Sequence, residues 1–299
     1  MEAKRPDFMY IPNFCNFYYY YSFIKDEDWS YILKTYNQDI IHLNISKVVY
    51  GTIIKFYNTL KLKRSSVIFN AMIFFHKFYI YNLYSKQVDL DNTKLAYLAV
   101  ACLYVGTKSS DLKIRIKDIL EYSYKANILP KELGDKNREI ILNYEFEILR
   151  IIQFDISNYG LTYKSSYYIF ESIFNSLKLE YKDPSVSENI KDYFLAQLRY
   201  SFIFPFFLKY DKKTIILSCV NLIFKQLFPN SIIPFWENKE FSDIKLDIID
   251  CSKLFSQLLI PKKENSVNAN NINNINNEEE KGININIVRN INSTITNNI

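Results

Sequence analysis

Apolar side chains recur every three or four positions through most of the chain, in segments of about 12 to 20 residues, which is the period of an α-helix. Short polar or proline-containing breaks separate the segments. We therefore predict helices at residues 26–37, 44–60, 65–84, 92–108, 113–126, 135–152, 161–178, 187–203, 212–227 and 242–259. Pro130, Pro184, Pro229 and Pro234 fall in the predicted breaks, and Pro205 should end the helix before it.

Glycine is scarce, with 5 Gly in 299 residues where average usage would give roughly 20. This scarcity argues against glycine-rich phosphate loops and against β folds built on tight turns. His42 and His76 are the two histidines of the chain, so few residues are available to form histidine metal sites or Ser-His-Asp triads. We expect no enzyme, and therefore no catalytic residue, no bound metal and no cofactor.

Two predicted helices are apolar on nearly every face, Leu95–Val105 and Ile215–Phe224, which a helix tolerates only when neighbours surround it. Aligning Cys102 with Cys219 superposes the two runs and indicates a duplicated helical unit with a period of about 117 residues. Small residues in the first run would let neighbouring helices approach closely: Ala96, Ala99, Ala101 and Gly106. The pattern predicts an all-α chain of two stacked helical domains.

Composition divides the chain further. We assign 1–43 to an N-terminal segment with a short helix, 44–157 to the first helical domain and 158–260 to the second. From Pro261 onward fourteen residues are Asn and none is aromatic, so 261–299 is expected to be a disordered tail.

The net charge of +5 is spread along the chain, which is too diffuse to indicate nucleic acid binding. The wide spacing of Cys15, Cys102, Cys219 and Cys251 fits reduced thiols of an intracellular protein. Leu95–Gly106, the longest apolar run, is shorter than the roughly 20 residues that span a bilayer. The aromatic run Phe17–Tyr21 fits packing better than base stacking, because no Lys or Arg is interleaved.

Two charged residues sit where charge is unexpected. Glu145 lies within an apolar stripe of the predicted helix 135–152, and a carboxylate there is costly unless it is satisfied. Lys108 ends the buried helix 92–108, where a cation also suits the helix dipole. Spacing alone leaves two readings open, a structural role for each charge or a functional pair. His76 lies on an apolar face with Phe69 and is read as a core histidine.

At these residues the chain resembles the cyclins, most closely their transcription-associated branch. The stretch from Leu60 to Tyr79 is similar to the second helix of the cyclin box, and Leu98-Ala-Val-Ala-Cys-Leu-Tyr-Val-Gly-Thr-Lys108 to its central helix with the signature lysine. Ile116-Lys-Asp-Ile-Leu120 resembles the motif that follows in cyclins of the K, L and T kinds. Tyr144-Glu-Phe-Glu-Ile-Leu-Arg-Ile-Ile-Gln-Phe-Asp155 resembles the fifth helix. A weaker likeness continues to about residue 260.

In this family the lysine and the glutamate hold the C-helix of a kinase, and apolar residues form the pocket around it. The resemblance implies that Lys108 and Glu145 bind a kinase here, with an apolar wall of Val105, Leu149, Phe154 and Ile156. The family's first helix usually carries an arginine that braces the box, whereas this chain has Ser46–Lys47 at that place.

The resemblance thus implies a non-catalytic subunit that activates a cyclin-dependent serine/threonine kinase in transcription or cell-cycle control. It implies a nuclear protein, with the cytoplasm as an additional location, no membrane partner and no direct contact with nucleic acid. Two alternatives stay open at this point. One is a general transcription initiation factor with two cyclin folds that grips promoter DNA, and the other is a helical scaffold that binds no kinase.

Overall fold

The structure of the chain is a computed structural model, and it describes residues 26–38, 40–84, 91–156, 163–176, 184–227 and 244–259. Within these ranges it is all helical, with ten α-helices, two short 3₁₀ turns and no strand. The all-α class expected from the sequence is confirmed. The N-terminal aromatic run, Cys15, Pro229, Pro234 and the predicted tail lie outside the described residues.

The described residues divide into two compact units. One unit contains the chain up to Thr162 together with Phe202–Asp211, and the other contains Tyr163–Ser201 and the chain from Lys212 onward. The helices of the first unit are α1 (Asp26–Gln38), α2 (Ile40–Thr59), α3 (Ser66–Tyr84), α4 (Asn92–Ser109), α5 (Ile116–Lys125) and α6 (Asp135–Ile151), with the 3₁₀ turns η3 (Lys131–Leu133) and η4 (Phe206–Leu208). The helices of the second unit are α7 (Tyr163–Ser176), α8 (Pro184–Tyr200), α9 (Lys212–Leu227) and α10 (Lys245–Leu259).

Two helices begin earlier than predicted, α8 and α2. Pro184, predicted to lie in a break, is the first residue of α8. The first N–H groups of a helix have no intrahelical acceptor, so the missing N–H of proline costs nothing there. α2 begins at Ile40, four residues before the predicted start, and a contact to α3 anchors its first turn: His42 Nδ1 lies 2.8 Å from the Tyr79 hydroxyl. Pro205, by contrast, lies beyond the end of α8, as predicted.

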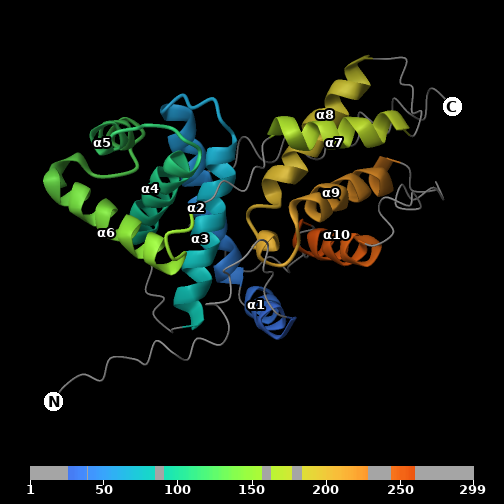
Figure 1. The fold of residues 1–299 in the computed structure, drawn as a ribbon, viewed down its shortest axis with the longest axis horizontal. Helices are drawn as coiled ribbons and strands as arrows, with labels where there is room; N and C mark the ends of the chain where they lie inside the picture. The colour runs from blue at the N-terminus through green and yellow to red at the C-terminus, as the bar shows by residue number, and fades with distance from the viewer. Residues whose placement is uncertain are drawn as a thin grey trace, which may run out of the picture. The chain divides into compact units, whose positions relative to one another are not determined.

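In the first unit α4 is the central helix, enclosed by α2, α3, α5 and α6 (Figure 1). Nearly every residue from Leu95 to Thr107 is buried, as the apolar sequence predicts. Gly106 permits the closest approach between α4 and α3. A Cβ atom at this position would lie 2.8 Å from the carbonyl oxygen of Val67 and 3.3 Å from Cβ of Ala71. The absence of a side chain at Gly106 therefore sets how tightly the two helices pack.

The short segment Phe202–Asp211 packs in the first unit, although the residues before and after it in the sequence belong to the second unit. The ring of Phe202 stacks on Phe69 of α3 with centroids 4.2 Å apart, and its carbonyl oxygen lies 2.7 Å from Nε2 of His76. On α1, Trp29 meets Phe204 edge to face at 5.8 Å. The first unit is thus completed by residues that lie some 40 positions beyond its main stretch of chain.

The second unit is built on α9, which packs against α7, α8 and α10. Its residues Thr214–Ile223 are all buried, so the second predicted central helix is also confirmed. The few polar side chains of this stretch are satisfied. Asn221 Nδ2 donates to Ser252 Oγ on α10 at 2.9 Å, and the Ser218 hydroxyl donates to the carbonyl oxygen of Thr214 at 2.7 Å. Cys219 and Cys251 are buried free thiols, as is Cys102 on α4.

Candidate functional site

Glu145 lies on the face of α6 that packs into the first unit. Helical spacing puts it in line with Ile141 and Ile148, both fully buried, and the side chain of Glu145 is only 9% exposed. A carboxylate in this position needs a cation or hydrogen-bond donors close by. The structure supplies them from the end of α4.

Lys108 at the last turn of α4 donates a hydrogen bond from Nζ to Glu145 Oε1 and forms an ion pair with it. The same ammonium group lies over the ring of Tyr104, 4.3 Å from its centroid. Burial opposes protonation of Lys108, but the hydrogen bond and charge of Glu145 outweigh it, so the pKa of Lys108 is raised above its ordinary value. The Lys108 side chain is 40% exposed, so this end of the pair faces solvent.

A buried polar cluster fixes the chain immediately after Lys108. Arg64 Nη1 donates to the carbonyl oxygen of Ser110 at 2.6 Å, and the hydroxyls of Ser66 and Ser110 are 3.1 Å apart. Asn70 Nδ2 donates to Ser109 Oγ at 2.9 Å and to Ser110 Oγ at 3.2 Å. These groups tie the end of α4 to the start of α3 and so position Lys108. A brace formed by an arginine is therefore present, but Arg64 provides it from the α2–α3 turn.

Sequence reasoning missed Arg64, Ser66 and Asn70. The signal that could have found them is the pair Ser109–Ser110, since two hydroxyls at the end of a buried helix need partners of their own.

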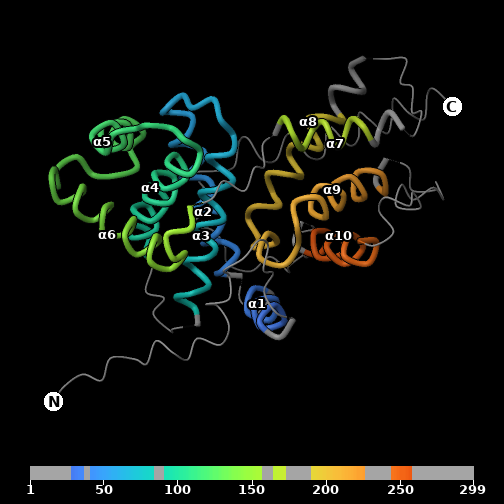
Figure 2. Tube along the Cα trace, viewed as in Figure 1, coloured from blue at the N-terminus to red at the C-terminus, as the bar shows by residue number. Residues whose placement is uncertain are grey.

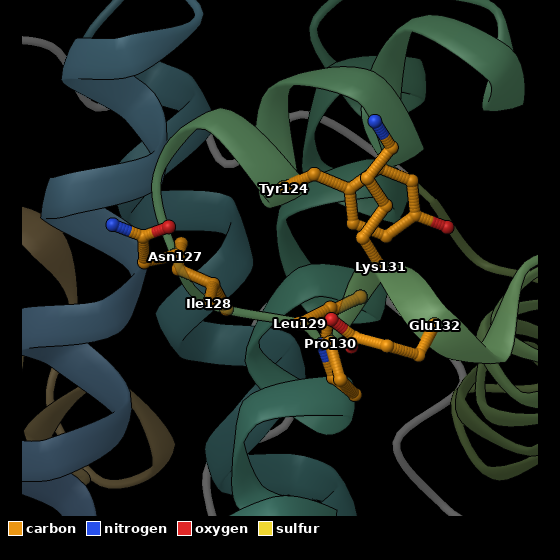
Figure 3. Close-up of a pocket in the computed structure, with 7 residues that line it drawn as sticks. All are labelled: Tyr124, Asn127, Ile128, Leu129, Pro130, Lys131 and Glu132. Atoms are coloured by element: carbon orange, nitrogen blue, oxygen red, sulfur yellow. The ribbon is translucent and has the colours of Figure 1, made fainter.

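A second polar cluster holds α6, the helix that carries Glu145. Asn137 in its first turn is fully buried, accepts a hydrogen bond from the Tyr97 hydroxyl of α4, and donates to the carbonyl oxygen of Pro130 at 2.6 Å. Next to it, the connection from α5 to η3 borders an open pocket of about 400 Å³, lined by Tyr124, Asn127, Ile128, Leu129, Pro130, Lys131 and Glu132 (Figure 3). None of these lining residues belongs to the Lys108–Glu145 site.

The four residues expected to form an apolar wall differ in how much of each is exposed to solvent. Val105 has no exposed surface and supports the site from within, whereas Leu149 and Ile156 are half-buried. Phe154 is 61% exposed. Phe146, which follows Glu145 directly and was not singled out in the sequence, is 57% exposed and meets Phe154 edge to face at 6.5 Å. Two large aromatic rings are thus exposed to solvent, one on the helix that carries Glu145 and one in the turn that follows it.

The turn that presents Phe154 has an uncommon backbone. Gln153 and Phe154 have φ values of 56° and 62°, in the left-handed region that residues with a Cβ atom avoid. The Phe154 N–H donates to the carbonyl oxygen of Leu149 at 2.7 Å, which closes the end of α6. Residues held in such conformations cluster at binding sites, and here the strained turn projects an exposed aromatic ring.

The charges of Lys77 and Asp155 attract each other. Burial lowers the pKa of Lys77 to about 8, while the negative charge of Asp155 acts to raise it. Lys77 belongs to α3 and Asp155 follows the strained turn, so the attraction acts between this turn and α3.

His76 lies in the core, as the sequence predicts. His76 is buried in the core, and Nε2 of its ring is hydrogen-bonded to the carbonyl oxygen of Phe202. Among the described residues no group of three His, Cys, Asp or Glu side chains is placed to hold a metal ion. No helix in the described ranges combines the length and the apolar character needed to cross a membrane.

No protein-family model matches this sequence, and no curated protein matches it. Among solved structures, the fold is similar to that of a chain in the CAK complex of Chaetomium thermophilum bound to ATP-gamma-S, with a TM-score of 0.50 and 14% sequence identity. The match covers 72% of this chain and 63% of that chain, so it spans less than two thirds of the neighbour's length. At this identity the likeness shows a shared fold: the chain has an all-α, cyclin-like architecture.

Proposed function

We propose that this chain is a non-catalytic regulatory subunit that binds and activates a cyclin-dependent serine/threonine kinase. The observation that carries the proposal is the Lys108–Glu145 pair of a cyclin-like fold, together with the exposed rings of Phe146 on the same helix as Glu145 and of Phe154 in the turn that follows this helix. Large exposed aromatic groups beside a partly desolvated charge are typical anchors of a protein interface. The solved neighbour comes from the CAK complex, which agrees with a kinase partner.

The arrangement suits capture of a helix from the kinase. Lys108 retains donor capacity beyond its bond to Glu145, because an ammonium group carries three hydrogens. Backbone carbonyls at the end of a partner helix could accept these bonds, while Phe154 and Phe146 cover the apolar side of that helix. Holding the kinase C-helix in this way would favour the orientation in which the lysine–glutamate pair and the metal-binding groups of the kinase align on ATP. In this proposal the chain itself performs no catalytic step.

The biological setting is a finer part of the same proposal. The likeness of the central motifs to transcription-associated cyclins supports a role in transcription or cell-cycle control, in the nucleus and additionally in the cytoplasm. Affinity purification of the tagged chain from its own cells, followed by mass spectrometry, tests the partner. Recovery of a cyclin-dependent kinase supports the proposal, and recovery of promoter-bound transcription factors without a kinase contradicts it.

A binding titration with the recovered kinase tests the surface. Phe154→Ala and Phe146→Ala should each weaken binding by about tenfold or more, because interface aromatics are common hot spots. Lys108→Ala and Glu145→Ala should cost roughly 2 kcal/mol, about thirty-fold in affinity, in the folded fraction. Tyr168→Ala on α7 is the matched control, since Tyr168 is an equally exposed aromatic residue in the other unit.

Kinase assays complete the test. The purified chain alone should transfer no phosphate, and the kinase should become more active when the chain is added. The proposal fails if the Phe154 and Phe146 variants bind and activate the kinase like the wild type, or if Tyr168→Ala weakens binding as much as they do.

A further inference from the structure

Basic side chains gather at one end of the first unit, from two stretches that lie far apart in the sequence. The α2–α3 turn carries Lys61, Lys63 and Arg64, and the α4–α5 connection with the first turn of α5 carries Lys113 and Lys117. All five are exposed. We name this set the basic face.

Direct contacts join the two stretches. The guanidinium of Arg64 is anchored on the carbonyl oxygen of Ser110, and the Ser66 hydroxyl lies 3.1 Å from that of Ser110. α5 also packs against α2. The tube in Figure 2 shows the α2–α3 turn and the segment leading into α5 at the same end of the unit. The basic face is therefore one surface of the folded unit.

Within the described part of the chain the charge of this surface is offset only in part, through the interaction of Lys117 with the charges of Asp118 and Glu121. Asp118 is engaged by Arg115 through two hydrogen bonds of 3.0 Å, and Glu121 is engaged by Lys125 at 2.7 Å. No ion pair joins any of the five basic residues to a described carboxylate. Asp111 is the acidic residue of the α4–α5 connection that stays outside these pairs.

Two helix starts reinforce the positive potential. α3 begins at Ser66, two residues after Arg64, and has no acidic residue in its first turn. α5 begins at Ile116, and its N-cap Arg115 makes no side-chain capping bond. The first turn of α5 holds Lys117 together with Asp118, whose carboxylate accepts hydrogen bonds from Arg115. The start of a helix carries a partial positive charge and favours acidic side chains, so basic residues there are unfavourable in the free protein. A bound anion would relieve this repulsion.

We propose that the basic face binds a phosphorylated segment of a partner protein. A phosphoserine or phosphothreonine offers close to two negative charges and three acceptor oxygens, which match the side chains of lysine and arginine. Residues 60–66 and 110–117 contain no aromatic side chain, so the surface lacks the stacking platform typical of single-stranded nucleic acid sites. The proposal goes beyond kinase activation, and neither Lys108 nor Glu145 belongs to the face.

The test uses the full-length chain and fluorescence anisotropy with a short labelled peptide that carries two phosphoserines. The phosphopeptide should bind, while the same peptide with unmodified serines should not. The double variant Lys63→Gln/Lys113→Gln should weaken binding by about tenfold or more, because each change removes a charge-assisted hydrogen bond to a phosphate group. Asp111→Asn should strengthen binding, because it removes the opposing charge from the same connection.

The matched control is Lys34→Gln/Lys47→Gln, which removes two exposed lysines of α1 and of the first half of α2 with the same change in net charge. This control should bind like the wild type. Equal weakening by the control, or equal binding of the unmodified peptide, overturns the proposal. Displacement of the phosphopeptide by a DNA duplex of random sequence at lower concentration overturns it in favour of a nucleic acid surface. Melting curves of each variant verify that the exposed substitutions leave the fold intact.

Discussion

Glu145 and Lys108 form an ion pair in which the two partners are buried to very different extents. The Glu145 side chain is 9% exposed and the Lys108 side chain 40%. Glu145 therefore relies on Lys108 for its neutralisation, whereas Lys108 can reach water and also contacts the ring of Tyr104. An unequal dependence of this kind has a measurable consequence for stability.

Lys108→Ala should destabilise the fold more than Glu145→Ala. The first change leaves a buried carboxylate unpaired, at a cost of about 3 kcal/mol or more, and the second leaves a lysine that turns to solvent, at a cost of about 1 kcal/mol. The double variant should recover much of the loss caused by Lys108→Ala. Urea unfolding of the three variants measures this order. Equal losses for the two single variants would contradict the unequal dependence.

Gly106→Ala should destabilise the first unit by about 1 to 3 kcal/mol. The added Cβ would lie 2.8 Å from the carbonyl oxygen of Val67, so α3 and α4 would have to separate. Gly51→Ala on α2 is the matched control, because no atom lies within 4 Å of a Cβ at that position. Since Gly51 is exposed within a helix, its replacement should stabilise by about 0.5 to 1 kcal/mol. Thermal melts should therefore shift in opposite directions.

Acid should weaken the fold through His76. Burial lowers the pKa of His76 to about 4, although its hydrogen bond to the Phe202 carbonyl oxygen acts in the opposite direction. In the unfolded chain the His76 side chain binds a proton near pH 6.5. The stability that the neutral His76 ring contributes is therefore fully present above that pH and is lost as the pH falls toward 4. His76→Gln should flatten the dependence of melting temperature on pH in this window.

Gln153→Gly should stabilise the protein by about 1 kcal/mol, because it relieves a left-handed backbone at φ 56°. Asn127 also has a positive φ, of 48°, but asparagine tolerates this conformation better. Asn127→Gly should therefore raise the melting temperature less than Gln153→Gly. If the two changes have the same effect, backbone strain at Gln153 is not the cause.

The scarcity of glycine explains why such strained positions recur. Lys61, Asp111, Asn127 and Gln153 follow the ends of α2, α4, α5 and α6, and all four adopt positive φ. Many helices end in a left-handed residue, usually glycine, because this closes the last carbonyl groups. With 5 Gly in the chain, other residues occupy these positions.

Much of the secondary structure follows from the sequence alone. The period of apolar residues is a local property of the chain, and it predicted every α-helix of the described residues with boundaries within a few positions. Near-continuous apolar runs predicted that α4 and α9 are central, because a helix without a polar face must be surrounded. The cost of a carboxylate on an apolar stripe also indicated that Glu145 needs a partner.

Contacts between distant segments were decided by tertiary structure. Nothing in the sequence near Phe202–Asp211 shows that its aromatic rings pack beside Phe69 and Trp29 in the first unit. The exposure of Phe146, the brace from Arg64 and the gathering of lysines into the basic face likewise depend on how helices dock. Helical periodicity is set by hydrogen bonds a few residues apart, whereas docking depends on the fit of side chains from segments remote in sequence. Local chemistry determined the elements, and packing between them determined the surfaces.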